Sequence, residues 1–511
     1  MALFLAHAFY LSGVAEDAFI SFRFARNLVA GHGLVWNPGE APVEGYTNFF
    51  WVLCSAGWIL LGVDPALGAQ QSGVAASLAT LWLVWRAGTR VLGWSAEQAL
   101  LPCFFLALAG PFAAWSMGGL ETSLFGMLLI WGVYRFSLYW SEKRSAHLFV
   151  AFAALLLASF TRPEGVLAIA LLAAVGVALG RSDARALRQL GGALLPTAIA
   201  FACFLAWRWS TFGSLLPNTF YAKTGDTGAQ VGRGAAYVGF FALHYLLPWL
   251  PAMALAWRGA PSRLRGQPLL LSCGVLLAGF SLAVIWEGGD YMAMYRFLAP
   301  LLPFVYLLLV AALWPALRID AAAPLRVGSA MALACAALGT LVHSTPLEAV
   351  LLPKPPRMHG NWRGVQTERW HVARLREIGR FFGEHARPGE SLATDAIGVI
   401  GWSSGLTVYG AHGLVDPVLA RRRAAGRIGA GVPGHERLDF AYLLERRPTF
   451  LMFRRELRSE KLGGLDFNRA VDPELVREYQ LRSVWLEDPA NRESGWFAFL
   501  ERRDRRVPAD P

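Results

Sequence analysis

Long apolar runs separated by short gaps restrict this chain more than any other feature of its sequence. A helix needs about 20 residues to cross the roughly 30 Å hydrocarbon core of a bilayer. Runs near that length lie at residues 1–14, 68–86, 97–115, 122–139, 147–161, 164–180, 191–207, 236–257, 267–286, 296–316 and 326–343. The pattern predicts an α-helical polytopic membrane protein with about 11 spans.

Charge is distributed unevenly along the chain. Charged residues make up 16% of the 511 residues, against about 25% in an ordinary soluble protein. They are sparse between residues 50 and 345 and dense from about 350 onward. We therefore expect a transmembrane domain over 1–345 and a soluble domain over 346–511. The net charge of +11 comes with no nucleic-acid-binding motif, so it indicates membrane orientation and no nucleic-acid partner.

Five short gaps between the runs are basic, as cytoplasmic loops are. Their basic residues are Arg86/Arg90, Lys143/Arg144, Arg181/Arg185/Arg188, Arg258/Arg263/Arg265 and Arg318/Arg326. They share one side if "FFWVLCSAGWILLGVD" (49–64) lies on the membrane face instead of crossing it. The opposite side then receives a first loop over 15–67 and the C-terminal domain. This arrangement predicts a bacterial inner-membrane protein whose polar loops face the periplasm.

Asp17 stands out in the first extracytoplasmic loop because it follows the first apolar run and precedes an amphipathic helical pattern. As a helix N-cap it would contribute about 1 kcal/mol. Other acids, Glu121, Glu164 and Asp290, lie in loops on the same side, and carboxylates at a membrane edge are costly and often functional. Pairing with nearby arginines is the alternative for two of them: Glu164 with Arg162, and Asp290 with Arg296.

Isolated cations on the same side suit a phosphate group, because arginine forms a forked contact and lysine a point charge. Lys223, in "LPNTFYAK", and Arg296, after "MAMY", are the candidates. Lys223 could equally be a headgroup anchor beside Tyr221. The sequence has no Walker loop and no Rossmann glycine motif, which argues against a nucleotide-driven reaction.

Several of these stretches together resemble a known family. They are "EDAFISFRFARNLVAGHGLVWNPGEAPVEGYTNFF", "GGLETSLF", "TRPEG", "PNTFYAK", "GGDYMAMYRFLAPLLP", and the C-terminal "TDAIGVIGWSSGLTVYGAHGLVDP" and "GHERLDFAYLLERRPTFLMF". The chain resembles the multi-spanning GT-C glycosyltransferases, especially the terminal arabinofuranosyltransferases of the mycobacterial cell wall and their bacterial relatives. The resemblance implies transfer of a sugar from a polyprenyl-phosphate carrier to an extracytoplasmic glycan or protein acceptor. A pentofuranose such as arabinofuranose is the best guess for the sugar.

The resemblance also implies an inverting displacement in which an acid of the first loop, here Asp17, serves as the base. Phosphate at the donor end would meet Lys223, Arg296, His32 and Arg23. Acceptor or cavity positions would be Glu16, Glu44, Tyr46, Asn48, Glu121, Asn218 and Asp290. No metal ligand is assigned, although adjacent Glu16 and Asp17 could hold a divalent ion. A transporter or flippase of lipid-linked sugars is the alternative, but the inverted half-repeats that such a protein needs are absent from the sequence.

The C-terminal domain alternates helix-like and strand-like stretches. "RWHVARLREIGRFFGEH" and "FAYLLERR" are helical in pattern, whereas "ESLATD", "LTVYGAHG", "PTFLMFR", "YQLRSVWL" and "WFAFLERR" are strand-like. This alternation favours an α/β layer around a largely parallel sheet. The domain would either hold the acceptor glycan or cap the helical bundle.

Overall fold

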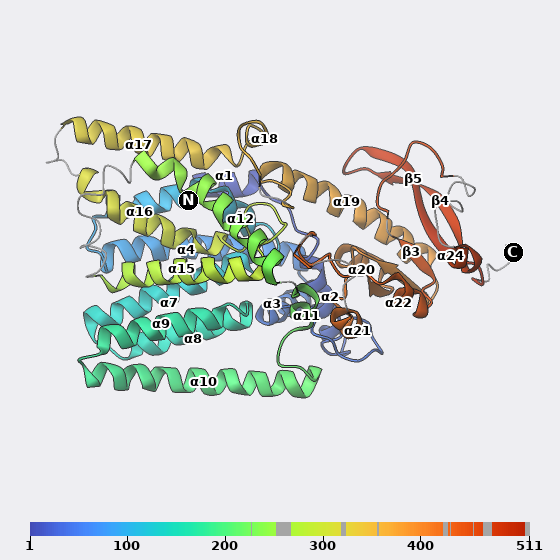
Figure 1. Cartoon of the computed structure of the whole chain (residues 1–511), viewed down its shortest axis with the longest axis horizontal. Helices are drawn as coiled ribbons and strands as arrows, with labels where there is room; N and C mark the ends of the chain where they lie inside the picture. The colour runs from blue at the N-terminus through green and yellow to red at the C-terminus, as the bar shows by residue number, and fades with distance from the viewer. Residues whose placement is uncertain are drawn as a thin grey trace.

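The structure is a computed structural model of the chain, and it describes residues 1–225, 227–251, 267–317, 323–354, 357–422, 428–429, 431–452, 454–462 and 473–505. Figure 1 shows a bundle of nearly aligned helices at one end and a small sheet with its helices at the other. The elements α2, α3, α11, α20 and α21 lie between these two parts.

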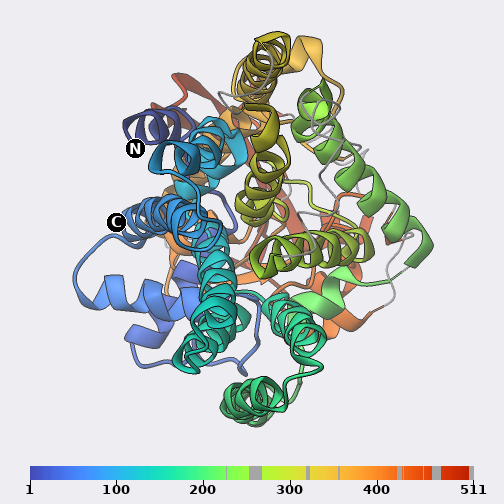
Figure 2. The ribbon, with the colours of Figure 1, turned by 90° about the vertical axis from the view of Figure 1, so that its left-hand side faces the viewer.

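Each predicted apolar run contains a helix. The helices of the first 345 residues are α1 Ala2–Tyr10, α2 Ala18–Val29, α3 Phe49–Leu60, α4 Pro65–Arg90, α5 Ala96–Leu108, α6 Gly110–Ser116, α7 Thr122–Glu142, α8 Ala146–Thr161, α9 Gly165–Gly180, α10 Ala184–Phe212, α11 Asn218–Lys223, α12 Thr227–Tyr245, η1 Leu247–Trp249, α15 Pro268–Glu287, η3 Ala299–Leu301, α16 Leu302–Leu317 and α17 Ala323–Val342. Figure 2 shows the helices of the bundle end-on, and their buried apolar side chains form one core.

Capping residues explain why several helices differ in length from the apolar runs. Helix α10 begins earlier than the predicted run because the Asp183 carboxylate accepts hydrogen bonds from two backbone amides, and it ends at Gly213 in the left-handed conformation. Ser95 and Gln98 form a capping box at the start of α5. The continuation of α5 into α6 bends by 70°, where Ala109 is extended and Pro111 follows.

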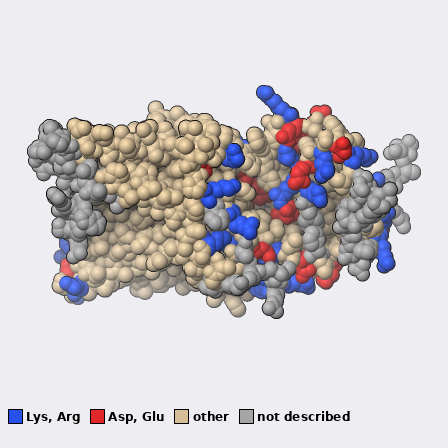
Figure 3. Space-filling view, turned by 45° about the horizontal axis from the view of Figure 1, so that its top comes forward, with Lys and Arg blue, Asp and Glu red and all other residues tan. Residues whose placement is uncertain are grey.

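The structure supports a membrane protein without fixing the number of spans. Of the described helices, α10 and α15 are each long and apolar enough to cross a bilayer, and the bent pair α5–α6 would be a third. Shorter apolar helices include α3, α8 and α9. Figure 3 shows an uncharged surface over most of the bundle, with charged side chains gathered mainly over the other half. Eleven spans remain a prediction. Residues 252–266 and 318–322, which carry most of the last two basic gaps, lie outside the described residues.

The C-terminal part is a sheet domain. Its strands are β1 Ser391–Thr394, β2 Thr407–Gly410, β3 Phe450–Met452, β4 Tyr479–Asp488 and β5 Glu493–Arg502, and its helices are α19 Trp362–His385, α20 Gly398–Ser404, α21 Pro417–Arg421, α22 Phe440–Glu445 and α24 Pro473–Glu478. Helix α18, Glu348–Leu351, precedes it. The strand order is β2-β1-β3-β5-β4. Phe382 of α19 packs its ring on Phe450 and Phe499 of the sheet.

A largely parallel sheet was expected, and this expectation is wrong for half of the sheet. Strand β1 pairs in parallel with β2 and β3, but β5 is antiparallel to β3 and to β4. A short turn joins β4 to β5, with Arg492 in the left-handed region. Such a turn leaves no room for the crossover that parallel pairing needs.

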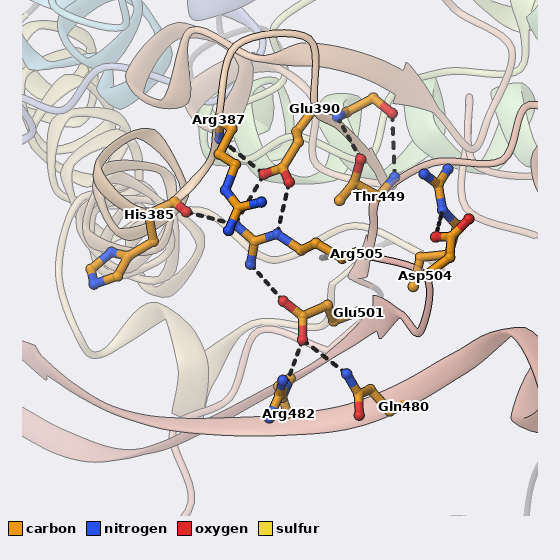
Figure 4. Close-up of polar contacts among 11 residues, drawn as sticks. His385, Arg387, Glu390, Thr449, Gln480, Arg482, Glu501, Asp504 and Arg505 are labelled. Carbon is orange, nitrogen blue, oxygen red and sulfur yellow. Dashed lines mark hydrogen bonds and ion pairs between the residues drawn. The ribbon is translucent and has the colours of Figure 1, made fainter. Parts of the chain in front are cut away.

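Ion pairs connect the segment after β5 with neighbouring parts of the sheet domain (Figure 4). Arg505, just after β5, contacts both Glu390 before β1 and Glu501 of β5, at 2.7 and 2.5 Å. Its guanidinium also donates to the carbonyl of His385 at the end of α19. Glu501 additionally accepts from Arg482 of β4. Arg505 thus joins the segment after β5 to the end of α19 and to the start of β1.

Candidate active site

A cavity of about 430 Å³ lies where the bundle meets the C-terminal domain. Its lining comes from residues within 17–21, 45–48, 120–121, 162–167, 216–233 and 283–297, and from Leu414, Pro433 and Gly434. Seven residues predicted for the site reach this cavity: Asp17, Tyr46, Asn48, Glu121, Lys223, Asp290 and Arg296. Segments that are far apart in the sequence therefore meet in one chamber.

Asp17 occupies the N-cap position of α2, but its side chain accepts no capping hydrogen bond. The carboxylate is 25% exposed, and its Oδ2 lies 3.7 Å from Nη1 of Arg296. An N-cap stabilises a helix through its side-chain oxygen, and here that oxygen faces the cavity instead. The capping explanation for an acid at this position is therefore wrong.

Arg296 lies between two carboxylates. Its Nε is 2.7 Å from Oδ2 of Asp290, so the ion pair expected from the sequence is present. Gly289, which precedes Asp290, has a φ of +71°, and a Cβ added to this glycine would lie 2.7 Å from Cβ of Tyr237. Glycine at this position is required by both the backbone conformation and the space. The arrangement presents a cation beside the Asp17 carboxylate.

A second polar group in the cavity lining is centred on Arg162, whose guanidinium lies against the same Phe297 ring as that of Arg296. Arg162 pairs with Glu121 at 3.0 Å and with Glu164 at 2.5 Å. Asn48 donates to the other oxygen of Glu121, and Ser21 donates to Asn48. The pairing of Glu164 with Arg162 is thus confirmed. Arg162 itself is a cavity residue that the sequence-based site set omitted, although "TRPEG" was the signal for it.

Lys223 stands alone among the cavity cations. It ends α11 and makes no hydrogen bond or ion pair to any residue that the structure describes. Its Cε would lie 3.1 Å from a Cβ placed on Gly434 of the C-terminal domain. The Lys223 side chain is exposed within the cavity. Desolvation by the surrounding protein lowers its pKa, and the nearby Asp17 carboxylate works in the opposite direction. An unpaired ammonium group in a chamber of this size is available to an anionic ligand.

Glu287 is a cavity residue that sequence reasoning missed. It ends α15 and lines the cavity, and its carboxylate has no hydrogen bond or ion pair within the described part of the chain, although its backbone carbonyl accepts from Gln230. Trp286, Phe220 and Phe297 add aromatic surface nearby. An acid at the end of an apolar run, in "WEGGD", was the available signal.

Arg23 was predicted to bind phosphate, but the structure gives it another position. It is 2% exposed and donates to the carbonyls of Gly401 and Leu406 at 2.6 and 2.7 Å, in the C-terminal domain. It also donates to the Trp36 carbonyl and to Oδ1 of Asn37. With its donors used in this way, Arg23 joins the first loop to the C-terminal domain and does not line the cavity.

Glu16 is also directed away from the cavity. Its Oε1 accepts hydrogen bonds from the amides of Gly398 and Val399 at the start of α20, and its own amide donates to Glu368. Burial, followed by the adjacent Asp17 charge, raises the pKa of Glu16 to about 8. Burial raises the pKa of Glu368 to about 7. Both shifts favour the neutral form of these two acids beside Asp17.

Three further predicted site residues lie outside the cavity lining. Glu44 is buried against Arg208, with 2.9 Å between Oε2 and Nε. Asn218 donates to the carbonyls of Gly413 and Leu414, and His32 is exposed in a turn after α2. Each was predicted from its place in a polar loop, which cannot distinguish a cavity wall from an interface or the outer surface.

A divalent ion on Glu16 and Asp17 does not fit this geometry, because the Glu16 carboxylate serves the α20 amides. Within the described residues there is also no group of three His, Cys, Asp or Glu side chains arranged to hold a metal. We therefore assign no chemical step to a metal.

Known proteins share parts of this sequence. Residues 361–505 match a family described as a domain of unknown function (DUF8728). The chain is 27% identical over 325 residues to the terminal beta-(1->2)-arabinofuranosyltransferase of Mycobacterium tuberculosis. That match covers 56% of this chain and 51% of that protein, so the chain spans about half the length of this curated relative.

Solved structures share its fold. The crystal structure of ArnT from Cupriavidus metallidurans bound to undecaprenyl phosphate matches 99% of this chain and 97% of that one, with a TM-score of 0.60 and 13% identity. The archaeal oligosaccharyltransferase AglB from Archaeoglobus fulgidus, in complex with an inhibitory peptide and a dolichol-phosphate, matches 100% of this chain and 75% of that one, with a TM-score of 0.51 and 12% identity. Because the likeness to ArnT follows almost the whole of both chains, this protein has an ArnT-like fold, with a sheet domain at its C-terminal end.

Proposed function

We propose that this protein is a membrane glycosyltransferase that takes a sugar from a polyprenyl-phosphate carrier. The observation that carries the proposal is the Asp17 carboxylate, uncapped and facing a cavity of about 430 Å³ beside Arg296, with unpaired Lys223 in the same lining. The arabinofuranosyltransferase relative and the lipid phosphate bound to ArnT support this choice of donor. Arabinofuranose is the proposed sugar, and a glycan or protein hydroxyl is the proposed acceptor.

The cavity residues account for each part of an inverting displacement. The acceptor oxygen attacks the anomeric carbon while its proton passes to a carboxylate oxygen of Asp17. The bond between the anomeric carbon and the phosphate oxygen breaks, and the polyprenyl phosphate leaves with the electron pair. Arg296 and Lys223 stabilise the negative charge that develops on this leaving group.

Transfer from polyprenyl-phosphate arabinofuranose to an arabinan acceptor by the purified protein tests this function, with Lys223→Ala measured in parallel. We expect the wild type to transfer the sugar. The variant should bind polyprenyl phosphate about 10-fold more weakly or worse, since it loses a charge-assisted contact, while acceptor binding changes little. Unchanged lipid-phosphate affinity in a folded variant would make Lys223 a headgroup anchor, and absence of transfer by the wild type with this donor would reject the assigned sugar.

We also propose that the cavity and the C-terminal domain face the periplasm. The basic gaps of the bundle, such as the one around Arg185, then face the cytoplasm. Alkaline phosphatase fused after residue 511 should be active, and the same reporter fused at Arg185 inactive. The opposite pattern would reject both this orientation and the periplasmic donor, because a donor on that face could no longer reach Asp17.

A further inference from the structure

The backbone just before Arg296 adopts a conformation that side-chain-bearing residues seldom adopt. Met294 and Tyr295 have φ values of +58° and +45°. Two consecutive left-handed residues that are not glycine are uncommon and persist only where surrounding contacts hold them. Both residues are fully buried. Such a pair turns the chain sharply immediately before the cation that contacts Asp17 and Asp290.

One contact that holds the turn is a hydrogen bond from Tyr295 to His244. Nε2 of His244 lies 2.9 Å from the carbonyl oxygen of Pro353. A carbonyl oxygen can only accept, so Nε2 carries the proton and Nδ1 of the neutral ring is an acceptor. The Tyr295 hydroxyl, 2.7 Å from Nδ1, is therefore the donor. The Pro353 carbonyl therefore determines both the tautomer of His244 and the direction of the hydrogen bond from Tyr295.

The other contact holds the neighbouring residue. Nε1 of Trp115, on α6, donates to the carbonyl of Met294 at 3.0 Å. The ring of the same tryptophan lies 6.0 Å from the guanidinium carbon of Arg296. Trp115 thus holds the peptide between Met294 and Tyr295 and lies next to the side chain of Arg296.

We propose that Tyr295 and His244 are positioning residues for Arg296. Relaxation of Tyr295 to a right-handed conformation would rotate the following residue, and Arg296 would lose its placement 2.7 Å from Asp290 and 3.7 Å from Asp17. The Tyr295 hydroxyl prevents this by joining the turn to α12. This inference rests on the proposed function only where it assigns the lipid phosphate to Arg296.

Tyr295→Phe tests the proposal, because it keeps the ring and removes only the donor. In the purified full-length protein, we expect undecaprenyl phosphate to bind about 5- to 20-fold more weakly, the usual effect of leaving one buried acceptor unpaired. Tyr245→Phe is the matched control. The Tyr245 ring lies 5.9 Å from the Tyr295 ring, and the Tyr245 hydroxyl has no hydrogen-bond partner among the described residues. The affinity of Tyr245→Phe for undecaprenyl phosphate should therefore equal that of the wild type.

The double variant separates positioning from general stability. If Tyr295 acts through Arg296, then Tyr295→Phe has no further effect on binding once Arg296→Ala is present. Additive losses, or no loss in Tyr295→Phe alone, would overturn the proposal. If the wild type does not bind undecaprenyl phosphate, the proposed donor class is wrong. Amide exchange over 291–297 then decides the positioning role: faster exchange in Tyr295→Phe than in Tyr245→Phe supports it, and equal exchange rejects it.

Discussion

Asp17→Asn is expected to lower sugar transfer by about 10²–10⁴-fold, the usual loss when a positioned base is removed. Asparagine keeps the shape of the side chain but cannot take the proton of an acceptor hydroxyl. Since the Asp17 side chain makes no capping hydrogen bond, the melting temperature should remain close to that of the wild type. The measurement is initial transfer rate with saturating donor, together with donor affinity, which should be nearly unchanged.

Glu16→Gln is the matched control for this experiment. Glu16 is the residue before Asp17. Because the pKa of Glu16 is raised to about 8, glutamine is a close substitute for the neutral carboxyl group that this raised pKa favours at pH 7. Glutamine also keeps an oxygen for the amides of α20. We expect transfer within a few-fold of the wild-type rate. If Asp17→Asn retained normal transfer, Glu121 and Glu287 would be the next candidates, because both carboxylates line the cavity.

Arg23→Ala is expected to destabilise the protein by on the order of 3–6 kcal/mol, because two buried carbonyl groups lose their short hydrogen bonds. These carbonyls belong to Gly401 and Leu406, so the change also weakens attachment of the C-terminal domain. The guanidinium also lies 4.4 Å from the centre of the Trp36 ring, and that contact disappears too. Arg23→Lys should recover only part of the loss, because one ammonium cannot reproduce the planar fork.

Thermal unfolding in detergent and protease cleavage near residue 346 measure this effect. Arg380→Ala is the control, since the Arg380 side chain is 56% exposed and, among the described residues, forms an ion pair only with Glu377 on the same helix. It should change stability by about 0.5 kcal/mol or less. If Arg23→Ala were as stable as the control but bound polyprenyl phosphate weakly, the original assignment of Arg23 to the phosphate would return.

The parts of the fold that were predictable are those that depend on local sequence. Apolar runs located the long helices of the bundle, and strand-like segments located the five strands of the described sheet, because both patterns repeat within a few residues. The short helices α11, α20, α21 and α24 were not predicted. The ends of α10 depended on Asp183 and Gly213, which lie outside the apolar run. Irregular backbone from Tyr291 to Leu298, where a span was expected to begin, could not be predicted because contacts with distant Trp115 and His244 support it.

The candidate site shows the same limit. The sequence placed Asp17, Lys223 and Arg296 on one side, and the structure brings them to one cavity. The sequence did not distinguish Arg23, which holds the C-terminal domain, from the cations that line the cavity. An amphipathic helix presents polar side chains in several directions, and periodicity does not show which of them meets another domain. The partners of Arg23 in the C-terminal domain lie 378 and 383 positions away along the chain, beyond the reach of any local pattern.

The long sequence separation of the contacts between the first loop and the C-terminal domain affects when the protein becomes active during its synthesis. During synthesis, the acceptor of Arg23 on Gly401 is made 378 residues after Arg23 itself. At about 5–20 residues per second, the ribosome needs roughly 20–80 seconds to supply that partner. Leu414, Pro433 and Gly434 of the cavity lining come later still. A chain released early would contain Asp17, Lys223 and Arg296 but not the complete chamber, so incomplete products should not consume the lipid-linked donor.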